Sequence, residues 1–467
     1  MEVARYKNFI LGDPILDVLN LDGHGYTKDC NMEGFDENLL LNNYIGKNKI
    51  LFTKKIADLL GDDFYYVQTS IGKIDILLKS SVVKKYFANN SIVSGNGYCM
   101  FTLEYSTIKL NSTGGLSNTG AQKYYNFKNW MLKTQCIKDG YNIDHSFVLG
   151  RRYKNCKGIV HEGFDFLVEN KETYDDLLET SIKHLSNIHY YTIGVDIFPN
   201  MKVKNDYPWH NAKKLIAGKI NEITLISGCS NKNRDEMVSQ GISSYKDIVH
   251  PMVQNTCDII NTECNTLPED ENMLFIDFEV LTSVYDDFST FPKSNDKSYI
   301  FNIGLGHIKN GEFMFESYMA KKISEEFQIV SEFVNFVNML QGDTVTFVHW
   351  TNIEQRLLNS VLKTYNLVIN KKIKWLDLYD YFKKNKVYVK GCYNYKLKFV
   401  SRQLYDTGLI QSKWSNSFAD GLGAMTAYII YISSHEKDSK ILEEIAYYNM
   451  IDCKVLWEIY ELLLSIK

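Results

Sequence analysis

Two acidic residues stand close together in a short apolar stretch of this chain. In LFIDFEVL, residues 274–281, Asp277 and Glu279 are two positions apart among apolar neighbours. Side chains alternate across a strand, so both carboxylates would point from the same face. Paired carboxylates repel, and a hard divalent cation such as Mg²⁺ or Mn²⁺ would stabilise them. A strand with one solvated face explains the pair equally well.

A third acid falls within an apolar stripe near the end of the sequence. Asp452 lies four residues after Tyr448, and both belong to a predicted helix. Burying a carboxylate without a partner is costly, so Asp452 needs a hydrogen-bond donor, a cation or water. A lysine would serve as a purely structural partner. The apolar residues that define the stripe by helical spacing are Ile441, Ile445, Tyr448, Val455 and Ile459.

Glu354 has two interpretations. The predicted strand DTVTFVHW is followed by Thr351-Asn-Ile-Glu354, in which Thr351 as N-cap and Glu354 would form a capping box. The same glutamate follows the carboxyl end of a strand, where open α/β sheets collect their functional groups. Both interpretations remain open at this point.

Together these residues resemble the ribonuclease H-like exonucleases with four acidic ligands, the DEDD group. The matching motifs are Asp277-Phe-Glu279, Glu354 and Tyr448-x3-Asp452, within residues 272–467. The resemblance implies two Mg²⁺ or Mn²⁺ ions held by Asp277, Glu279, Glu354 and Asp452, with Tyr448 orienting the attacking water. It also implies hydrolysis of DNA or RNA from the 3′ end. Two ions about 4 Å apart can activate a water and stabilise the leaving oxygen together.

The third acid departs from the usual pattern of that group, which has Asp in an Asn-containing segment. This chain offers HWTNIE, and a variant branch with His-Trp and Glu is the closer match. His349 and Asp343 are neighbouring alternatives to Glu354 as a ligand.

A second candidate site lies near the N-terminus. Asp75 in GKIDILL, Glu104 in CMFTLEYS and Gln122 at a helix start resemble the PD-(D/E)xK nucleases in their RecB-like form. That family has a lysine two residues after the second acid, where this chain has Ser106. Lys109 has the wrong strand parity to replace it. Loss of the lysine favours a structural or DNA-gripping role over cleavage, although a lysine from elsewhere in the fold would restore the set.

The stretches between and beyond these sites suggest nucleic-acid contacts. Residues 223–248 resemble a helix-hairpin-helix element, predicted as three helices with turns at Gly228 and Gly241. The upstream PNMKVKNDYPWHNAKKLIA resembles the linker of a family that joins a RecB-like nuclease to an exonuclease. Lysines and aromatics also alternate between Lys371 and Lys398, where they would meet phosphates and bases unless this is simply a solvated loop. The residues predicted to bind nucleic acid are Lys383, Lys384, Lys386, Tyr388, Lys390 and Tyr393.

The elements that must position these residues predict an α/β protein in three parts. Residues 1–150 form a degenerate RecB-like domain and residues 151–268 a helical connector. Residues 269–467 form a mixed-sheet domain of ribonuclease H type. In that domain a three-stranded meander, turning at Lys309-Asn-Gly, precedes alternating helices and strands.

Composition bounds the function. The 467 residues are 45 % hydrophobic and carry a net charge of −4, which excludes a general electrostatic grip on nucleic acid but not a local one. No GxSxG, Walker or GxGxxG motif is present. Nine Cys without CxxC pairs, and no long apolar run, favour a soluble intracellular protein without membrane contact, in cytoplasm or nucleus. The Lys, Asn, Ile and Tyr content is typical of AT-rich genomes, viral or otherwise.

Two functions are therefore predicted. One is a metal-dependent 3′–5′ exonuclease acting on DNA or RNA that is single-stranded or has a free end. The alternative is an inactive nucleic-acid-binding or assembly scaffold that retains both nuclease folds.

Overall fold

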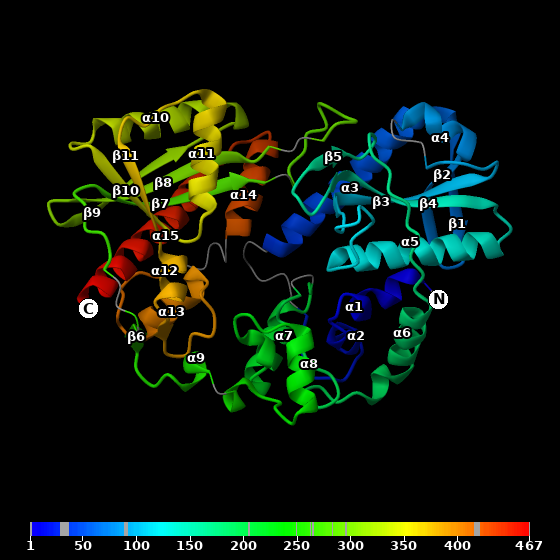
Figure 1. The fold of residues 1–467 in the computed structure, drawn as a ribbon, viewed down its shortest axis with the longest axis horizontal. Coiled ribbons are helices and arrows are strands. Elements are labelled where there is room, and N and C mark those ends of the chain that lie inside the picture. The colour runs from blue at the N-terminus through cyan, green and yellow to red at the C-terminus, as the bar shows by residue number, and fades with distance from the viewer. Residues whose placement is uncertain are drawn as a thin grey trace. The chain divides into compact units, whose positions relative to one another are not determined.

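Two compact α/β units make up the chain in the computed structural model (Figure 1). The structure describes residues 2–28, 37–87, 92–203, 206–248, 250–261, 263, 266–282, 284–294, 297–414 and 421–466. Unit 1 consists of Met1–Cys30, Leu41–Ile220 and Ser283–Asp296, and unit 2 of Asn31–Leu40, Asn221–Thr282 and Lys297–Lys467. A short segment after residue 282 thus belongs to unit 1, although unit 2 holds the chain before and after it.

Unit 1 is built on a five-stranded sheet in the order β1-β2-β3-β4-β5. Strands β3 and β4 are parallel and joined by helix α5, whereas the other neighbours are antiparallel. The strands predicted in KIDILL and CMFTLEYS and the helix predicted in AQKYYNFKNWMLK are confirmed. The predicted boundary after Gly150 falls inside β4. The strands are β1 (Phe64–Thr69), β2 (Gly72–Lys79), β3 (Tyr98–Lys109), β4 (Ile143–Lys154) and β5 (Val160–Glu162).

Helices cover both faces of this sheet because β3 is apolar on both. Phe101 and its alternate neighbours pack against Phe52 of α3, whereas Met100 packs against Leu132 of α5. Residues of even number in β3, including Glu104, therefore belong to the face that α5 covers. The helices of unit 1 are α1 (Lys7–Ile10), α2 (Ile15–Leu19), α3 (Glu37–Leu60), α4 (Ser80–Tyr86), α5 (Ala121–Lys138), α6 (Asp175–Asn187) and α7 (His210–Ile220).

The segment after residue 282 is anchored in the core of unit 1. Phe288 is buried and Phe291 half-buried in the same apolar cluster as Phe52. The Tyr105 hydroxyl donates a hydrogen bond of 3.1 Å to the Val284 carbonyl oxygen. Buried Asp286 lies 3.6 Å from the guanidinium of Arg151, so an ion pair adds to the apolar anchoring.

Unit 2 contains a second five-stranded sheet, in the order β11-β10-β7-β8-β9. The predicted meander is confirmed as the antiparallel strands β7 (Met273–Leu281), β8 (Tyr299–Lys309) and β9 (Glu312–Met319). The predicted fourth strand is β10 (Thr344–His349), which pairs in parallel with β7. The fifth, β11 (Lys372–Asp377), pairs in parallel with β10 and is not predicted from the sequence. The predicted helices between and after the strands are confirmed.

Helices lie on both sides of this sheet (Figure 1). On one face Phe278 of β7 contacts Phe333 of α10, with ring centroids 6.2 Å apart. On the other face Phe275 contacts Tyr460 of α15 at 5.7 Å. Asp277 and Glu279 share the face of Phe275, so they point toward α15. The helices are α10 (Glu326–Met339), α11 (Ile353–Tyr365), α12 (Leu378–Lys384), α13 (Leu397–Asp406), α14 (Gly421–Ser433) and α15 (Ser439–Ser465).

The connector is less helical than predicted. The turns at Gly228 and Gly241 exist, with φ of +81° and +86°. Only α8 (Asn231–Ser239) between them is an α-helix, and its flanks, Ile223–Leu225 and Tyr245–Asp247, are single 3₁₀ turns. The first of these ends because the Ser227 N–H donates to the Tyr393 carbonyl instead of continuing a helix. After α9 (Pro251–Gln254), β6 (Ile259–Asn261) pairs with β12 (Val387–Val389) within unit 2. In the described part of the chain, each helix is too short or too polar to cross a bilayer.

Candidate metal centre and nucleic-acid interface

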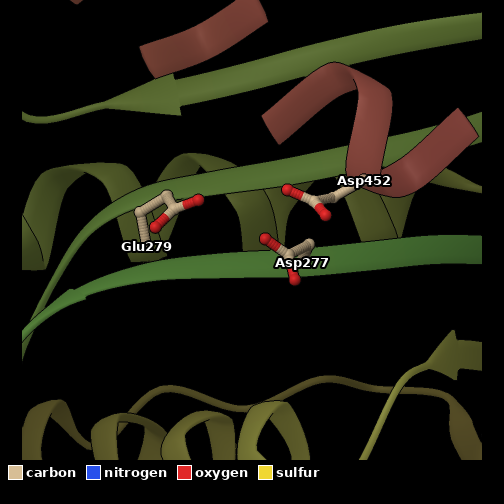
Figure 2. Close-up of side chains that lie close together, drawn as sticks. All are labelled: Asp277, Glu279 and Asp452. Atoms are coloured by element: carbon tan, nitrogen blue, oxygen red, sulfur yellow. The ribbon is translucent and has the colours of Figure 1, made fainter. Parts of the chain in front are cut away.

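Strand β7 and helix α15 bring three carboxylates together. Asp277 and Glu279 come from the strand and Asp452 from the helix, and their ligand oxygens lie within 4.8 Å of one another. Figure 2 shows the carboxylates of Asp277 and Asp452 facing each other, with Glu279 beside them. Glu279 and Asp452 are buried, while Asp277 keeps part of its surface exposed. The face of β7 that carries the acids is therefore covered by a helix rather than solvated.

A chain of buried amides fixes Asp277. The Asn449 side-chain amide donates to Asp277 Oδ2 at 2.7 Å, and Asn302 donates to Asn449 Oδ1 at 3.1 Å. The Ser317 hydroxyl in turn donates to Asn302 at 2.8 Å. Gly304, opposite Asp277 in β8, makes room for this chain, because a Cβ there would lie 1.8 Å from Asn449 Oδ1.

Burial makes these carboxylates hard to ionise. It raises the pKa of Asp277 to about 6, against the hydrogen bond from Asn449 and the positive charge of Lys398. Burial, and then the charge of Asp277, raise the pKa of Glu279 and of Asp452 well above the ordinary range. A cluster of this kind is stable in its charged form only with added positive charge.

Glu354 lies near this cluster but outside the three-carboxylate group. It is buried in the first turn of α11, and burial followed by the charge of Asp277 raises its pKa well above the usual value. Its Oε2 lies 3.7 Å from Nδ1 of His349. Burial lowers the pKa of His349, so this ring offers no full charge to Glu354. The alternative ligand Asp343 is exposed and precedes β10, at the end of the strand away from His349.

The predicted capping box at the start of α11 is wrong. The N-cap is Asn352, which makes no side-chain bond to the helix, and Thr351 has φ of +80°. The Thr351 N–H instead donates to Oδ1 of Asp377 at 3.0 Å. Positive φ at a β-branched residue costs about 1–3 kcal/mol and collects at functional sites. Tertiary contact with the end of β11, rather than helix capping, therefore sets this turn and the position of Glu354.

The donor set fits divalent metal ions. Buried Asp452 Oδ2 and Glu354 Oε2 accept no hydrogen bond from any described residue. Oxygens from two or more carboxylates suit Mg²⁺ and Mn²⁺. Asp277, Glu279 and Asp452 would form the centre of such a site, with Glu354 beside them.

A family model of the RNase_H superfamily matches residues 284–464. The C-terminal domain is RNase H-like. The match begins just after β7, but β7 pairs with both β8 and β10 and is the central strand of the same sheet. An RNase H-like domain indicates nuclease-type activity on nucleic acid. No curated protein matches the chain.

Two residues of the RNase H-like site were not predicted from the sequence. Lys398 of α13 places its ammonium 4.3 Å from the ring centroid of Tyr448 and 5.3 Å from that of Trp414. Its charge lowers the pKa of Asp277, Glu279 and Asp452, against the effect of burial. Tyr448, which was predicted from the sequence, is buried and hydrogen-bonds to Asp452. Lys398 lies in a segment rich in Lys and Tyr, so nothing in the sequence distinguishes it as a residue of the acidic site. Asn449, next to Tyr448, is equally unmarked.

The predicted basic and aromatic stretch is partly occupied by its own contacts. Lys384 lies 2.6 Å from Asp380, Lys386 2.5 Å from Glu263 and Lys390 3.8 Å from Asp258. Lys383 lies over the ring of Tyr379 at 5.3 Å, and Tyr393 packs on Tyr245 at 4.5 Å. Tyr388 is half-buried in β12. These lysines are exposed and still able to meet phosphates, but acidic neighbours offset part of the charge of Lys384, Lys386 and Lys390.

In unit 1 two lysine side chains form ion pairs with the buried acid of the second predicted site. Glu104 is buried, with Lys49 and Lys128 each 3.1 Å from one of its oxygens. Asp75 accepts a hydrogen bond of 2.8 Å from the Leu103 N–H. Gln122 accepts one of 3.3 Å from the Lys109 N–H, so it binds the strand end rather than the acids.

Proposed function

We propose that the RNase H-like domain is a metal-dependent exonuclease that hydrolyses DNA or RNA from the 3′ end. The observation that carries the proposal is the largely buried group of Asp277, Glu279 and Asp452, whose oxygens lie within 4.8 Å of one another. Such a group needs positive charge, and the superfamily match supports phosphodiester chemistry there. The polarity rests on the resemblance of Asp277-Phe-Glu279, Glu354 and Tyr448-x3-Asp452 to the DEDD group.

Each residue of the site would have its own role in hydrolysis. Asp277, Glu279, Glu354 and Asp452 would hold Mg²⁺ or Mn²⁺, which when bound supplies Lewis-acid activation of water and neutralises the leaving oxygen. The Tyr448 hydroxyl, held by Asp452, would orient the attacking water. The Lys398 ammonium would attract the scissile phosphate. Asn449 and Asn302 hold Asp277 in place.

The element order of unit 1 supports its RecB-like prediction. Helix α3, strands β1 to β3, helix α5 and strand β4 follow in the order that we expect for the PD-(D/E)xK fold, with the short helix α4 inserted between β2 and β3. Asp75 and Glu104 also stand on neighbouring strands. The helix-hairpin-helix assignment has weaker support, because α8 is the only full helix of that segment.

The test is degradation of end-labelled single-stranded DNA and RNA with Mn²⁺ by the full chain and by Asp452→Asn. We expect shortening from the 3′ end by the wild type and none by the variant. Tyr447→Phe, five residues before Asp452 on the exposed side of α15, is the matched control and should cleave normally. Absence of cleavage by the folded wild type, with metal-independent binding, would favour the scaffold.

A further inference from the structure

The acidic residues of the second predicted site are surrounded by ammonium groups. Lys49 reaches Glu104 Oε2 from α3, and Lys128 reaches Oε1 from α5, both at 3.1 Å. Burial lowers the pKa of Lys7; the charge of Glu104 opposes this shift and that of Lys49 adds to it. Two ammonium groups thus contact the carboxylate of Glu104 directly.

This charge balance does not fit a divalent metal ion. Both Glu104 oxygens already have cationic partners, and one Asp75 oxygen is bound to a backbone N–H. A metal ion would have to displace the lysines and then stay close to their repelling charges. Although burial lowers the pKa of Lys128, Glu104 and Asp75 raise it overall, so this ammonium stays charged. The two lysines exceed Glu104, their direct partner, by one positive charge, which suits an anion.

The lysines also remain accessible to a ligand. The Lys49 side chain is 37 % exposed and that of Lys128 20 %, whereas that of Glu104 is 10 % exposed. The acid therefore lies beneath the ammonium groups. It fixes two flexible side chains in one place, which reduces the entropy lost when they bind a phosphate together.

We propose that Lys49 and Lys128 form a metal-independent site for a phosphate group of a nucleic-acid strand, with Glu104 as their anchor rather than a metal ligand. This rests on the proposed action on nucleic acid. Unit 1 then grips the strand without cutting it, and cleavage belongs to unit 2. Backbone contacts of this kind give affinity without sequence preference.

The experiment measures binding of a fluorescein-labelled 20-nucleotide single strand to the full chain in EDTA, by anisotropy at several salt concentrations. We expect Lys49→Gln and Lys128→Gln each to weaken binding several-fold and to lower the salt slope by about 0.7. Lys54→Gln, an exposed lysine on α3, is the control and should change nothing.

A second arm asks whether unit 1 cuts. Asp452→Asn with Mn²⁺ should leave the strand intact, with or without Glu104→Gln. Unchanged binding in the lysine variants would overturn the proposal. So would cleavage by Asp452→Asn that Glu104→Gln abolishes, which would make Glu104 a metal ligand. Melting curves check that each variant folds. If Lys128→Gln does not fold, the binding measured for Lys49→Gln, at the more exposed lysine, decides. Because binding is measured in EDTA, its outcome is independent of whether unit 2 cleaves.

Discussion

The side-chain amide of Asn449 donates a hydrogen bond of 2.7 Å to Asp277. Asn449 belongs to helix α15, and Asp277 belongs to strand β7 of the sheet in the RNase H-like domain. Asn302 and Ser317 continue this contact through β8 and β9. Helix α15 is thus connected to the first acid of β7 as well as supplying Asp452. The hydrogen-bond chain therefore helps to fix the distance between the carboxylates of Asp277 and Asp452.

Asn449→Ala should reduce Mn²⁺ affinity and exonuclease rate by about 10–100-fold, the usual effect of removing a residue that orients a metal ligand. The substitution removes the hydrogen bonds that Asn449 makes with Asp277 and Asn302. Calorimetric titration with Mn²⁺ measures the affinity, and Tyr447→Phe is the control. Unchanged affinity would show that Asp277 needs no such support.

Gly304→Ala should destabilise unit 2 by about 1–3 kcal/mol, because its Cβ would displace the Asn449 amide. Activity should fall further than stability accounts for. Gly218→Ala in α7 is the matched control: nothing lies within 4 Å of its added Cβ, and alanine favours a helix by about 1 kcal/mol. Urea unfolding compares the two. Equal unfolding free energies of the two variants would contradict the close approach at Gly304.

Chelated protein should lose stability as pH rises from 5 to 7.5. Unfolded carboxyls titrate near about 4, whereas burial raises the pKa of Asp277 to about 6. Between these values the native state holds more protons, so its stability falls with pH, by about 1–3 kcal/mol per group. Mg²⁺ should reverse the trend at pH 7.5 by binding the ionised carboxylates. Thermal melts with EDTA and with Mg²⁺ test this, and a pH-independent melt in EDTA would refute it.

Glu354→Gln should abolish most cleavage while making the protein more stable. The substitution keeps the shape of a buried side chain and removes a carboxylate that lacks a cationic partner among the described residues. We expect a gain of about 1–3 kcal/mol in unfolding free energy. Full activity in this variant would remove Glu354 from the ligand set.

Lys398→Met should lower kcat by about 10–100-fold without weakening Mn²⁺ binding at pH 8. Its ammonium repels metal ions but would attract the scissile phosphate. Lys398→Arg should restore part of the rate. Lys413→Met is the control, since Lys413 also lies over a tyrosine ring, at 4.8 Å from that of Tyr405. Weaker metal binding in Lys398→Met would instead show a structural role.

Alternation and helical spacing were enough to predict β7, α15 and the face on which Asp277 and Glu279 lie. These signals are local, and the burial of Asp452 within an apolar stripe is local too. Thr351 shows where local reasoning fails, because its conformation is set by Asp377 at the end of a neighbouring strand. Lys49, Lys128 and Lys398 carry no sequence signal either. Each is defined by partners that only folding brings near.

The packing of Phe288 and Phe291 in unit 1 has a consequence for dissecting this protein. The polypeptide leaves unit 2 directly after β7, contributes to the other core, and returns as β8. No single peptide bond separates the two units, so a fragment that starts before β7 would carry unburied phenylalanines into solution. A cut within residues 284–294 would leave the acidic strand and the remainder of its sheet on different pieces of chain.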